Sequence, residues 1–349
     1  MNGRMLLSFP LTMMLSVSWA YGENALLTAT YDPLATPNEV AKAPLDFVVK
    51  DAARKRDIPI LVYLPTAKTG TAVVLFSHGL GGTRKGCSYL GKHWAARGYV
   101  AVFLQHPGSD DSVWKEQHPG KRMAAMEAAA SGQNFMLRVR DVPAVLNQLE
   151  VWHKSADHPL SGRLDFSRVG MSGHSFGAVT TQAVSGQSFA GRALLTDTRI
   201  RAAIAFSPSS PRRGKPATAF GNVKIPWMLM TGTKDVSVIG HTDLASRLAV
   251  YPALKAEKYE LVLHDGQHSA FSDRALPGET GKRNPNHHRV ILALSTAFWD
   301  TYLLQSEPAR KWLQGPGPRS VLEEKDRWQL SVSSRKTQQG SATVKPGGK

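Results

Sequence analysis

One serine of this chain stands in a pattern that could make it a nucleophile. Residues 173–177 read Gly-His-Ser-Phe-Gly, which is a G-x-S-x-G sequence. At a sharp turn between a strand and a helix, this sequence holds its serine in a strained conformation with the hydroxyl exposed. Residues 166–172 are typical of a short strand, and residues 178–184 of the start of a buried helix. The pattern therefore predicts Ser175 as the nucleophile of an acyl-transfer reaction.

A five-residue pattern of this kind also arises by chance, roughly 0.2 times in a chain of this length and composition. The alternative interpretation is a glycine-rich turn with an incidental serine. Residues 186–190, Gly-Gln-Ser-Phe-Ala, come close to the pattern, but no strand is expected before them. The strand and helix expected on either side of residues 173–177 favour the nucleophile there.

A serine hydroxyl reacts readily only when a base removes its proton, and an acid residue fixes the orientation of that base. In proteins with this serine turn, the acid and then the histidine follow the serine along the chain. Asp235 comes shortly after the apolar run 226–230, and we expect it in the loop beyond that strand. Asp243 and Asp197 are the alternatives for the acid.

Twelve histidines compete for the role of the base. His268 is the predicted base, because it follows the apolar run 259–263 and its loop would reach the same sheet edge as the nucleophile. His264 is expected to remain on that strand as a structural residue. His287 and His288 are expected on the surface, at the start of a closing helix.

The negative charge that develops on a carbonyl oxygen during acyl transfer needs two N–H donors. One comes from the residue after the nucleophile, which is Phe176. The second is expected from the glycine-rich loop 77–82, Ser-His-Gly-Leu-Gly-Gly, which follows the apolar run 72–76. We assign the backbone N–H of Leu80 to this role. A glycine-rich turn without a catalytic role is the alternative.

Two further side chains are expected to border the substrate pocket. His174 precedes the nucleophile and is also expected to pack within its turn. Trp114 lies in the polar loop 105–122, which follows the apolar run 99–104. Because the end of that run is expected to face the site, the loop would form one wall of the pocket.

Apolar runs separated by helical segments indicate an α/β fold, with a mostly parallel sheet and helices on both of its faces. The continuous apolar runs typical of buried parallel strands are 72–76, 99–104, 200–206, 226–230 and 259–263. Residues 45–49 and 58–64 are expected to form an antiparallel pair before them. The expected helices are 90–97, 121–149 with a break near Ser131 and a new start at 141–143, and 287–304.

The two ends of the chain are expected to lie outside the catalytic domain, which is assigned to residues 23–306. Residues 1–22 are typical of an export signal, with Arg4 before an apolar stretch and a final Ala-Tyr-Gly that fits a cleavage site. An uncleaved N-terminal anchor is the alternative. Residues 307–349 are expected to be an extension, largely disordered after about residue 331. We therefore expect an exported protein, periplasmic or secreted.

The formal net charge is +16, but the basic residues are scattered and do not alternate with aromatic residues. A nucleic-acid-binding face needs them clustered, so we expect no nucleic acid as a partner. The excess of positive charge favours a weak association with anionic surfaces.

The chain offers no recognisable metal or cofactor motif. It contains no H-E-x-x-H, no phosphate-binding loop and no dinucleotide fingerprint. His264 and His268 flank an Asp-Gly turn, which would not hold them as two ligands on one helix face. Cys87 is the only cysteine, so no internal disulfide can form, and we expect it buried or half-buried rather than nucleophilic. We therefore expect neither a metal nor a cofactor.

Four segments together resemble the secreted α/β-hydrolases: 76–82, 173–177, 232–235 and 266–268. The resemblance covers about residues 45–304 and is to platelet-activating-factor acetylhydrolase-like esterases and the bacterial dienelactone-hydrolase-like proteins near them. It implies the α/β-hydrolase fold. It also implies hydrolysis of small-molecule or lipid-like carboxylic esters through a serine-bound acyl intermediate, without a cofactor.

The chain departs from some members of this group. Dienelactone hydrolases use a cysteine nucleophile, whereas this chain has Ser175, which argues against their substrate. Polyester hydrolases of the cutinase type usually have Met or Gln where Phe176 stands, and an aromatic residue where Leu80 stands. Polyester hydrolysis and peptidase activity on the same fold stay alternatives. A non-catalytic binding module derived from a hydrolase is the alternative of another class.

Overall fold

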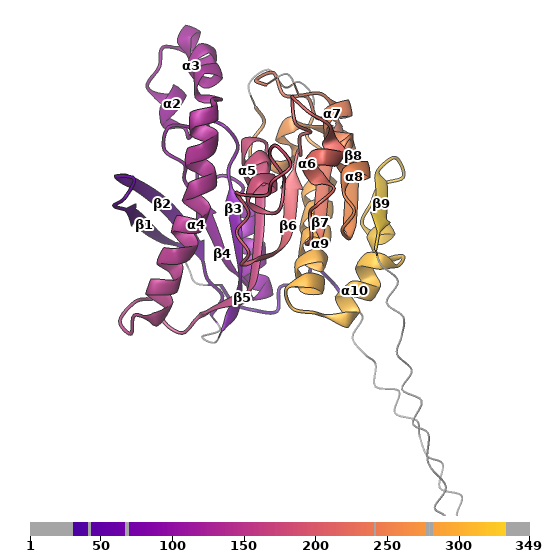
Figure 1. Cartoon of the computed structure of the whole chain (residues 1–349). Helices are drawn as coiled ribbons and strands as arrows, with labels where there is room; N and C mark the ends of the chain where they lie inside the picture. The colour runs from indigo at the N-terminus through magenta and orange to yellow at the C-terminus, as the bar shows by residue number, and fades with distance from the viewer. Residues whose placement is uncertain are drawn as a thin grey trace, which may run out of the picture. The chain divides into compact units, whose positions relative to one another are not determined.

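In the computed structural model, the described residues are 31–40, 43–66, 70–240, 242–276, 279 and 282–332. The predicted export signal, residues 1–22, lies outside them. The described residues form a nine-stranded sheet with the strand order β1-β2-β4-β3-β5-β6-β7-β8-β9 and helices on both faces (Figure 1). The prediction of an α/β fold with a mostly parallel sheet is confirmed.

The central strands of the sheet are parallel. In spatial order they are β4 (Val100–Leu104), β3 (Thr71–Ser77), β5 (Leu164–His174), β6 (Ile200–Phe206), β7 (Trp227–Lys234) and β8 (Lys258–Gln267). Antiparallel neighbours extend the sheet at both ends: β1 (Leu45–Asp51) and β2 (Arg56–Tyr63) beside β4, and β9 (Arg327–Ser331) beside β8. The carboxyl ends of the parallel strands therefore meet at one edge, where their loops can combine into a site.

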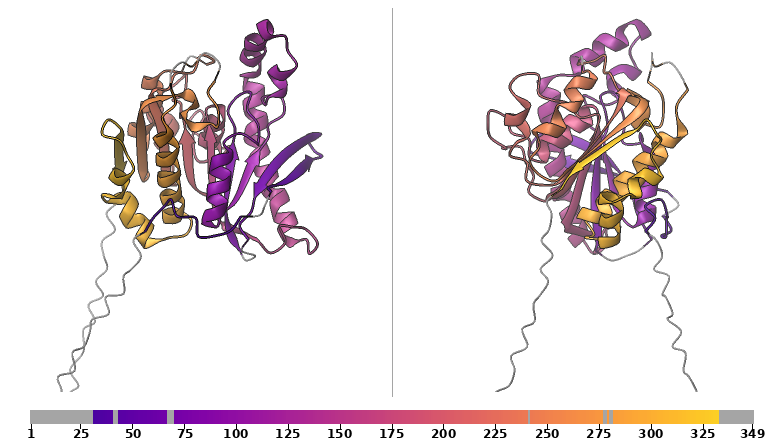
Figure 2. Two further views of the ribbon diagram at one scale, coloured as in Figure 1. Left: turned by 180° about the vertical axis from the view of Figure 1, so that it is seen from behind. Right: turned by 90° about the vertical axis from the view of Figure 1, so that its right-hand side faces the viewer.

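Alternate side chains of the strands point to opposite faces of the sheet. In β3, Val74 and Phe76 belong to one apolar cluster, and Val73 and Leu75 to another. The first cluster includes residues of α1 (Ser88–Arg97), α9 (Pro285–Tyr302) and α10 (Glu307–Gln314). The other face is covered by α4 (Gly132–Lys154), α5 (Phe176–Val184), α6 (Pro216–Phe220) and α8 (Val250–Ala253). Figure 2 shows both layers.

Shorter helices lie in the loops between these elements. They are α2 (Ser112–Lys115), α3 (Arg122–Ala129) and α7 (Leu244–Leu248), with 3-10 turns at η1 (Pro119–Lys121), η2 (His268–Phe271) and η3 (Gly317–Ser320). In Figure 1, α2 and α3 lie beyond the first turn of α4. None of the helices in the described part of the chain is long and apolar enough to cross a membrane.

Two interruptions were predicted in the helical segment 121–149, and the structure contains one of them. The expected break is confirmed, since Ser131 caps α4 by accepting a hydrogen bond from the backbone N–H of Asn134 at 3.1 Å. The expected start at 141–143 is wrong, because α4 runs without interruption through Pro143 to Lys154. Its buried side chains continue past the proline, and this packing outweighs the one backbone hydrogen bond that a proline cannot make.

The chain after residue 306 contributes to the same sheet, where an extension was expected. β9 pairs with β8 over five residues, so β9 and not β8 is the strand at this end of the sheet. Leu313 of α10 is fully buried in the core cluster on one face of the sheet. The folded unit therefore continues to residue 331. The rest of the expected extension, residues 333–349, lies outside the described residues.

A pair of leucine substitutions tests this boundary. Leu313→Ala should lower the free energy of unfolding by about 2–5 kcal/mol, because it opens a cavity in the core. Leu304→Ala is the matched control: this leucine is 40% exposed, and its truncation should cost well under half as much. Urea unfolding of both variants measures the difference. Equal, small effects would show that α10 does not belong to the cooperative core.

Candidate active site

Ser175 occupies a strained turn between β5 and α5. Its backbone angles are φ 57° and ψ −115°, a conformation that residues with a side chain rarely adopt. A Cβ atom at Gly177 would collide with the carbonyl oxygen of Ser77, and one at Gly173 would collide with the backbone of Gly177. Only glycine fits on both sides of Ser175, which explains the spacing of the G-x-S-x-G sequence.

The structure brings Ser175, His268 and Asp235 together. Ser175 Oγ lies 2.8 Å from His268 Nε2, and His268 Nδ1 lies 2.6 Å from Asp235 Oδ1. The three residues follow β5, β8 and β7, so the carboxyl ends of three parallel strands position them. Because Nδ1 faces a carboxylate, it carries the proton in the neutral ring, and Nε2 is free to accept one from Ser175.

The two alternative acids make other contacts. Asp243 caps α7 by accepting a hydrogen bond from the backbone N–H of Ser246 at 2.8 Å. Asp197 pairs with Arg199 at 2.6 Å. Neither carboxylate is paired with His268 in the described part of the chain, so Asp235 is the acid that the geometry selects.

Asp235 is fully buried and ionised. Burial alone would favour the neutral acid, but the hydrogen bond and charge of His268 and the charge of Arg247 outweigh it and lower the pKa of Asp235 to about 2. Thr231 Oγ1 donates a further hydrogen bond to Oδ2 at 2.8 Å. The carboxylate therefore has a fixed orientation toward His268 and stays charged throughout the neutral range.

Arg247 is a site residue that the sequence did not reveal. Its guanidinium is buried and lies 2.9 Å from Asp235 Oδ1. Its Nε donates to the backbone oxygen of Asp235 at 2.8 Å, and its Nη1 to that of Ser207 at 2.9 Å. Arg247 thereby ties the acid loop after β7 to the loop after β6. It lies on the short helix α7, and no motif marks it.

His174 lies behind the base and is only 6% exposed. Its Nε2 donates to the backbone oxygen of His268 at 2.9 Å, and the centroids of the two rings are 4.7 Å apart. Burial, together with the charge of His268, lowers the pKa of His174 to about 3, so its ring is neutral. This placement fits the predicted packing within the turn. Its expected second role, bordering a pocket, stays a prediction.

The loop expected to hold an oxyanion lies directly beside Ser175. A Cβ atom built on Gly79 would lie 3.4 Å from Ser175 Cβ. The backbone N–H of Gly81 donates to the backbone oxygen of Ser109 at 2.9 Å, which fixes the far end of the loop. Leu80 lies between these two glycines. Phe176, the other predicted donor, is the first residue of α5, where a backbone N–H has no partner within the helix.

Trp114 contacts this loop directly. Its Nε1 donates to the backbone oxygen of Gly81 at 2.8 Å, and the guanidinium of Arg122 lies 5.6 Å from its ring centroid. Trp114 therefore packs against the glycine-rich loop from α2. This position is compatible with the predicted pocket wall beside Leu80.

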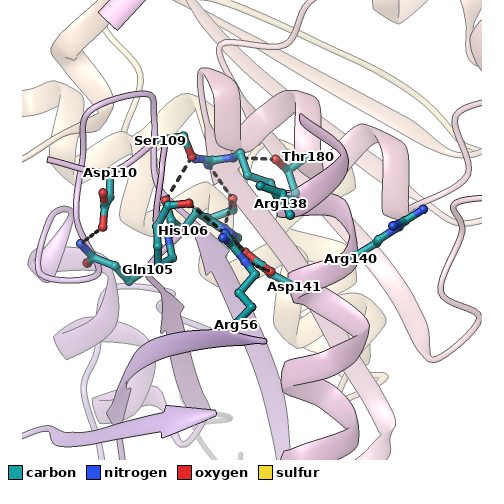
Figure 3. Close-up of polar contacts among 12 residues, drawn as sticks. Arg56, Gln105, His106, Ser109, Asp110, Arg138, Arg140, Asp141 and Thr180 are labelled. Atoms are coloured by element: carbon teal, nitrogen blue, oxygen red, sulfur yellow. Dashed lines mark hydrogen bonds and ion pairs between the residues drawn. The ribbon is translucent and has the colours of Figure 1, made fainter. Parts of the chain in front are cut away.

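A second Ser–His–Asp chain lies next to the first. Ser77 Oγ is 2.9 Å from His106 Nε2. His106 Nδ1 is 2.9 Å from Asp141 Oδ2, and Figure 3 shows these two residues. All three residues are fully buried, and Ser77 Oγ also accepts a hydrogen bond from Arg138 Nη2 at 3.0 Å. A substrate cannot reach Ser77, whereas Ser175 is only half-buried. The accessible hydroxyl is therefore that of Ser175.

The remaining histidine and cysteine predictions have mixed outcomes. His264 lies on β8 as predicted. The prediction of a surface position is wrong for His287, which is buried and donates from Nε2 to the backbone oxygen of His264 at 3.0 Å. His288 is half-buried, and its ring stacks on Tyr89 with centroids 3.9 Å apart. Cys87 is buried as predicted, and burial raises the pKa of its thiol.

The described residues contain no group of three or more His, Cys, Asp or Glu side chains arranged to hold a metal ion. A scan of the chain against models of protein families gives no match, and a search of the curated proteins gives none either. The functional argument therefore depends on the geometry around Ser175.

A glycine substitution tests the serine turn. Gly177→Ala should abolish folding or lower the free energy of unfolding by at least about 4 kcal/mol, because its methyl would overlap the Ser77 carbonyl. Gly132→Ala is the control, since a Cβ atom there meets open space at the start of α4. It should be neutral or stabilise by up to about 1 kcal/mol. A well-folded Gly177→Ala variant with unchanged stability would contradict the described turn.

Three buried histidines should make stability depend on pH. Burial is the largest cause that lowers the pKa values of His78, His106 and His174, to about 4 for His106 and about 3 for His174. In the unfolded chain these histidines take up a proton below about pH 6.5. In the folded chain they stay neutral to a lower pH, because their pKa values are lowered. The free energy of unfolding should therefore fall between pH 6.5 and 4.5, by up to about 1.4 kcal/mol per pH unit for each histidine.

His174→Gln isolates one of these contributions, because a glutamine amide can still donate to the His268 carbonyl. Chemical unfolding at several pH values should give a shallower slope for this variant than for the unchanged protein. Identical slopes would show that His174 is not a buried neutral residue.

Proposed function

We propose that this protein is a serine hydrolase of the α/β-hydrolase fold that cleaves carboxylic esters through an acyl-enzyme intermediate. The observation that carries the proposal is the chain of contacts from Ser175 Oγ to His268 Nε2 at 2.8 Å and from His268 Nδ1 to Asp235 at 2.6 Å. The strained serine turn, the order of the three residues along the chain and the adjacent glycine-rich loop support it.

In the first half of the reaction, the hydroxyl of Ser175 attacks the carbonyl carbon of the ester while its proton passes to His268 Nε2. The carbonyl oxygen becomes negative and accepts hydrogen bonds from the backbone N–H groups of Leu80 and Phe176. The carbon–oxygen bond to the leaving alcohol then breaks, and His268 returns the proton to that alcohol. An acyl group remains on Ser175.

In the second half, His268 accepts a proton from a water molecule that attacks the acyl carbon. The bond between that carbon and Ser175 Oγ then breaks, His268 returns the proton to Oγ, and the acid is released. The buried carboxylate of Asp235 stabilises the protonated imidazole at both steps. Arg247 holds that carboxylate in place. These steps need only the described side chains and water.

The substrate that we propose is a small-molecule or lipid-like ester, and the chain is proposed to be exported, to the periplasm or beyond the cell. The net charge of +16 would favour weak association with anionic surfaces. A series of p-nitrophenyl esters of increasing acyl length, with polyester and peptide substrates alongside, ranks the ester hypothesis against polyester hydrolase and peptidase activity.

A fluorophosphonate probe tests the nucleophile. The unchanged protein should be labelled at Ser175, and Ser175→Ala should abolish labelling and lower turnover of short esters by at least about 10⁴-fold. Ser188→Ala is the matched control, because Ser188 stands in the related sequence 186–190 and should not affect labelling. If the unchanged protein is not labelled, or Ser175→Ala retains most of its activity, the proposed function fails and a binding module is favoured.

A further inference from the structure

Arg138 of α4 has a fully buried guanidinium, and its hydrogen-bond partners among the described residues are all uncharged. Its Nε donates to Thr180 Oγ1 at 3.1 Å, and its Nη1 to Ser109 Oγ at 2.9 Å (Figure 3). Its Nη2 donates to Ser77 Oγ at 3.0 Å and to the backbone oxygen of His78. A buried cation without a carboxylate partner is costly for stability, so its position calls for a functional explanation.

On one side, these contacts fix the glycine-rich loop that contains Leu80. The guanidinium binds the carbonyl of His78, two residues before Leu80. It also binds the hydroxyl of Ser109, whose own carbonyl accepts the backbone N–H of Gly81, one residue after Leu80. Arg138 therefore anchors the loop on both sides of the predicted donor.

On the other side, Arg138 fixes the second predicted donor, Phe176. The guanidinium carbon lies 4.6 Å from the centroid of the Phe176 ring, a cation–π contact. The hydroxyl of Thr180, which accepts from Arg138, in turn donates to the backbone oxygen of Phe176 at 3.0 Å. One guanidinium thus contacts the surroundings of both N–H groups that would hold an oxyanion.

The hydrogen bonds of His78 also fix the glycine-rich loop. Its Nε2 accepts the backbone N–H of His106 at 3.1 Å, so the ring proton lies on Nδ1, which donates to the carbonyl of Gly79 at 2.6 Å. The ring stays neutral because burial, and then the charge of Arg138, lower its pKa. His78 therefore holds the loop from within while Arg138 holds its carbonyl.

The nearest acids, Asp141 and Asp110, offset only part of the cost of burying the charge of Arg138. Burial lowers its pKa to about 9, while Asp141 and Asp110 raise it and Arg56 lowers it, so it remains protonated at neutral pH. Arg56 binds Asp141 through two contacts of 2.8 Å. Asp110 accepts a hydrogen bond from Gln105 at 2.8 Å. The guanidinium therefore presents a positive charge to the loop and turn beside Ser175.

We propose that Arg138 is a positioning residue for the oxyanion. Its planar guanidinium holds the loop of Leu80 and the turn of Phe176 at a fixed separation. Its positive charge favours a negative oxygen between the N–H groups of these two residues. This inference rests on the proposed function, since it concerns the same reaction. It assigns a role to a residue that contacts neither Ser175 nor His268.

The test uses an alkyl trifluoromethyl ketone labelled with ¹³C at its carbonyl carbon. Attack by Ser175 Oγ forms a tetrahedral hemiketal, and the ¹³C shift followed against pH gives the pKa of its oxygen. Arg138→Met should raise this pKa by at least about one pH unit and lower kcat about 10- to 100-fold, with KM changed less than threefold. Arg138→Lys keeps the positive charge but loses the planar guanidinium that binds several oxygens at once. It should give a smaller change in the hemiketal pKa and in kcat, in the same direction.

Arg97→Met is the stability control. Arg97 is also largely buried, but it pairs with Asp300 at 2.6 Å, on the face of the sheet opposite α4. It should lower the thermal midpoint without changing the hemiketal pKa. A merely structural role for Arg138 predicts the same outcome for its variants.

The outcomes separate the two proposals. If the unchanged protein forms no hemiketal, the proposed function fails. If it does, and either Arg138 variant is folded with the hemiketal pKa and kcat of the unchanged protein, only the role of Arg138 is overturned. Should Arg138→Met fail to fold, Arg138→Lys decides the question by the same criterion.

Discussion

The close approach of β3 and the serine turn is the constraint on which the rest of the site depends. The carbonyl of Ser77 occupies the space that a side chain at position 177 would need, and position 173 is equally crowded. With no side chains on either flank, the backbone at Ser175 can take its positive φ. The same approach brings the loop after β3 against the turn, so that residues a hundred positions apart in sequence share one small volume. A change of register between β3 and β5 would therefore separate the hydroxyl from the glycine-rich loop.

Two buried arginines organise the polar groups around this contact. Arg247 binds the carboxylate and the backbone of Asp235, so the acid cannot turn away from His268. Arg138 packs against the ring of Phe176, next to the turn, and binds neutral oxygens. One arginine therefore stabilises a permanent negative charge, and under the proposed function the other lies beside the groups that would hold a transient one. Buried charges are costly, and hydrogen bonds to the surrounding oxygens stabilise both of these.

The parts of this arrangement that the sequence could predict are those with local signals. Ser175 has glycines on both sides, and Asp235 and His268 directly follow apolar runs, so strand ends could be recognised without knowing the fold. Arg138, Arg247 and the chain Ser77–His106–Asp141 have no such signals, because each depends on contacts between distant segments. Pro143 gave a misleading signal: a residue common at helix starts lies inside α4, where packing on both sides of it maintains the helix. The burial of His287 and the pairing of β9 likewise follow only from tertiary contacts.

The position of β9 has a consequence for how the protein is made. β8 lies between β7 and β9, but about sixty residues of chain, including all of α9 and α10, must be synthesised between β8 and β9. Until then one edge of β8 has unpaired backbone groups, and such an edge can pair with the same edge of another chain. A nascent or truncated polypeptide therefore exposes an unpaired edge of β8 that β9 covers in the folded molecule. Chaperones that bind extended segments would be of most use during that interval.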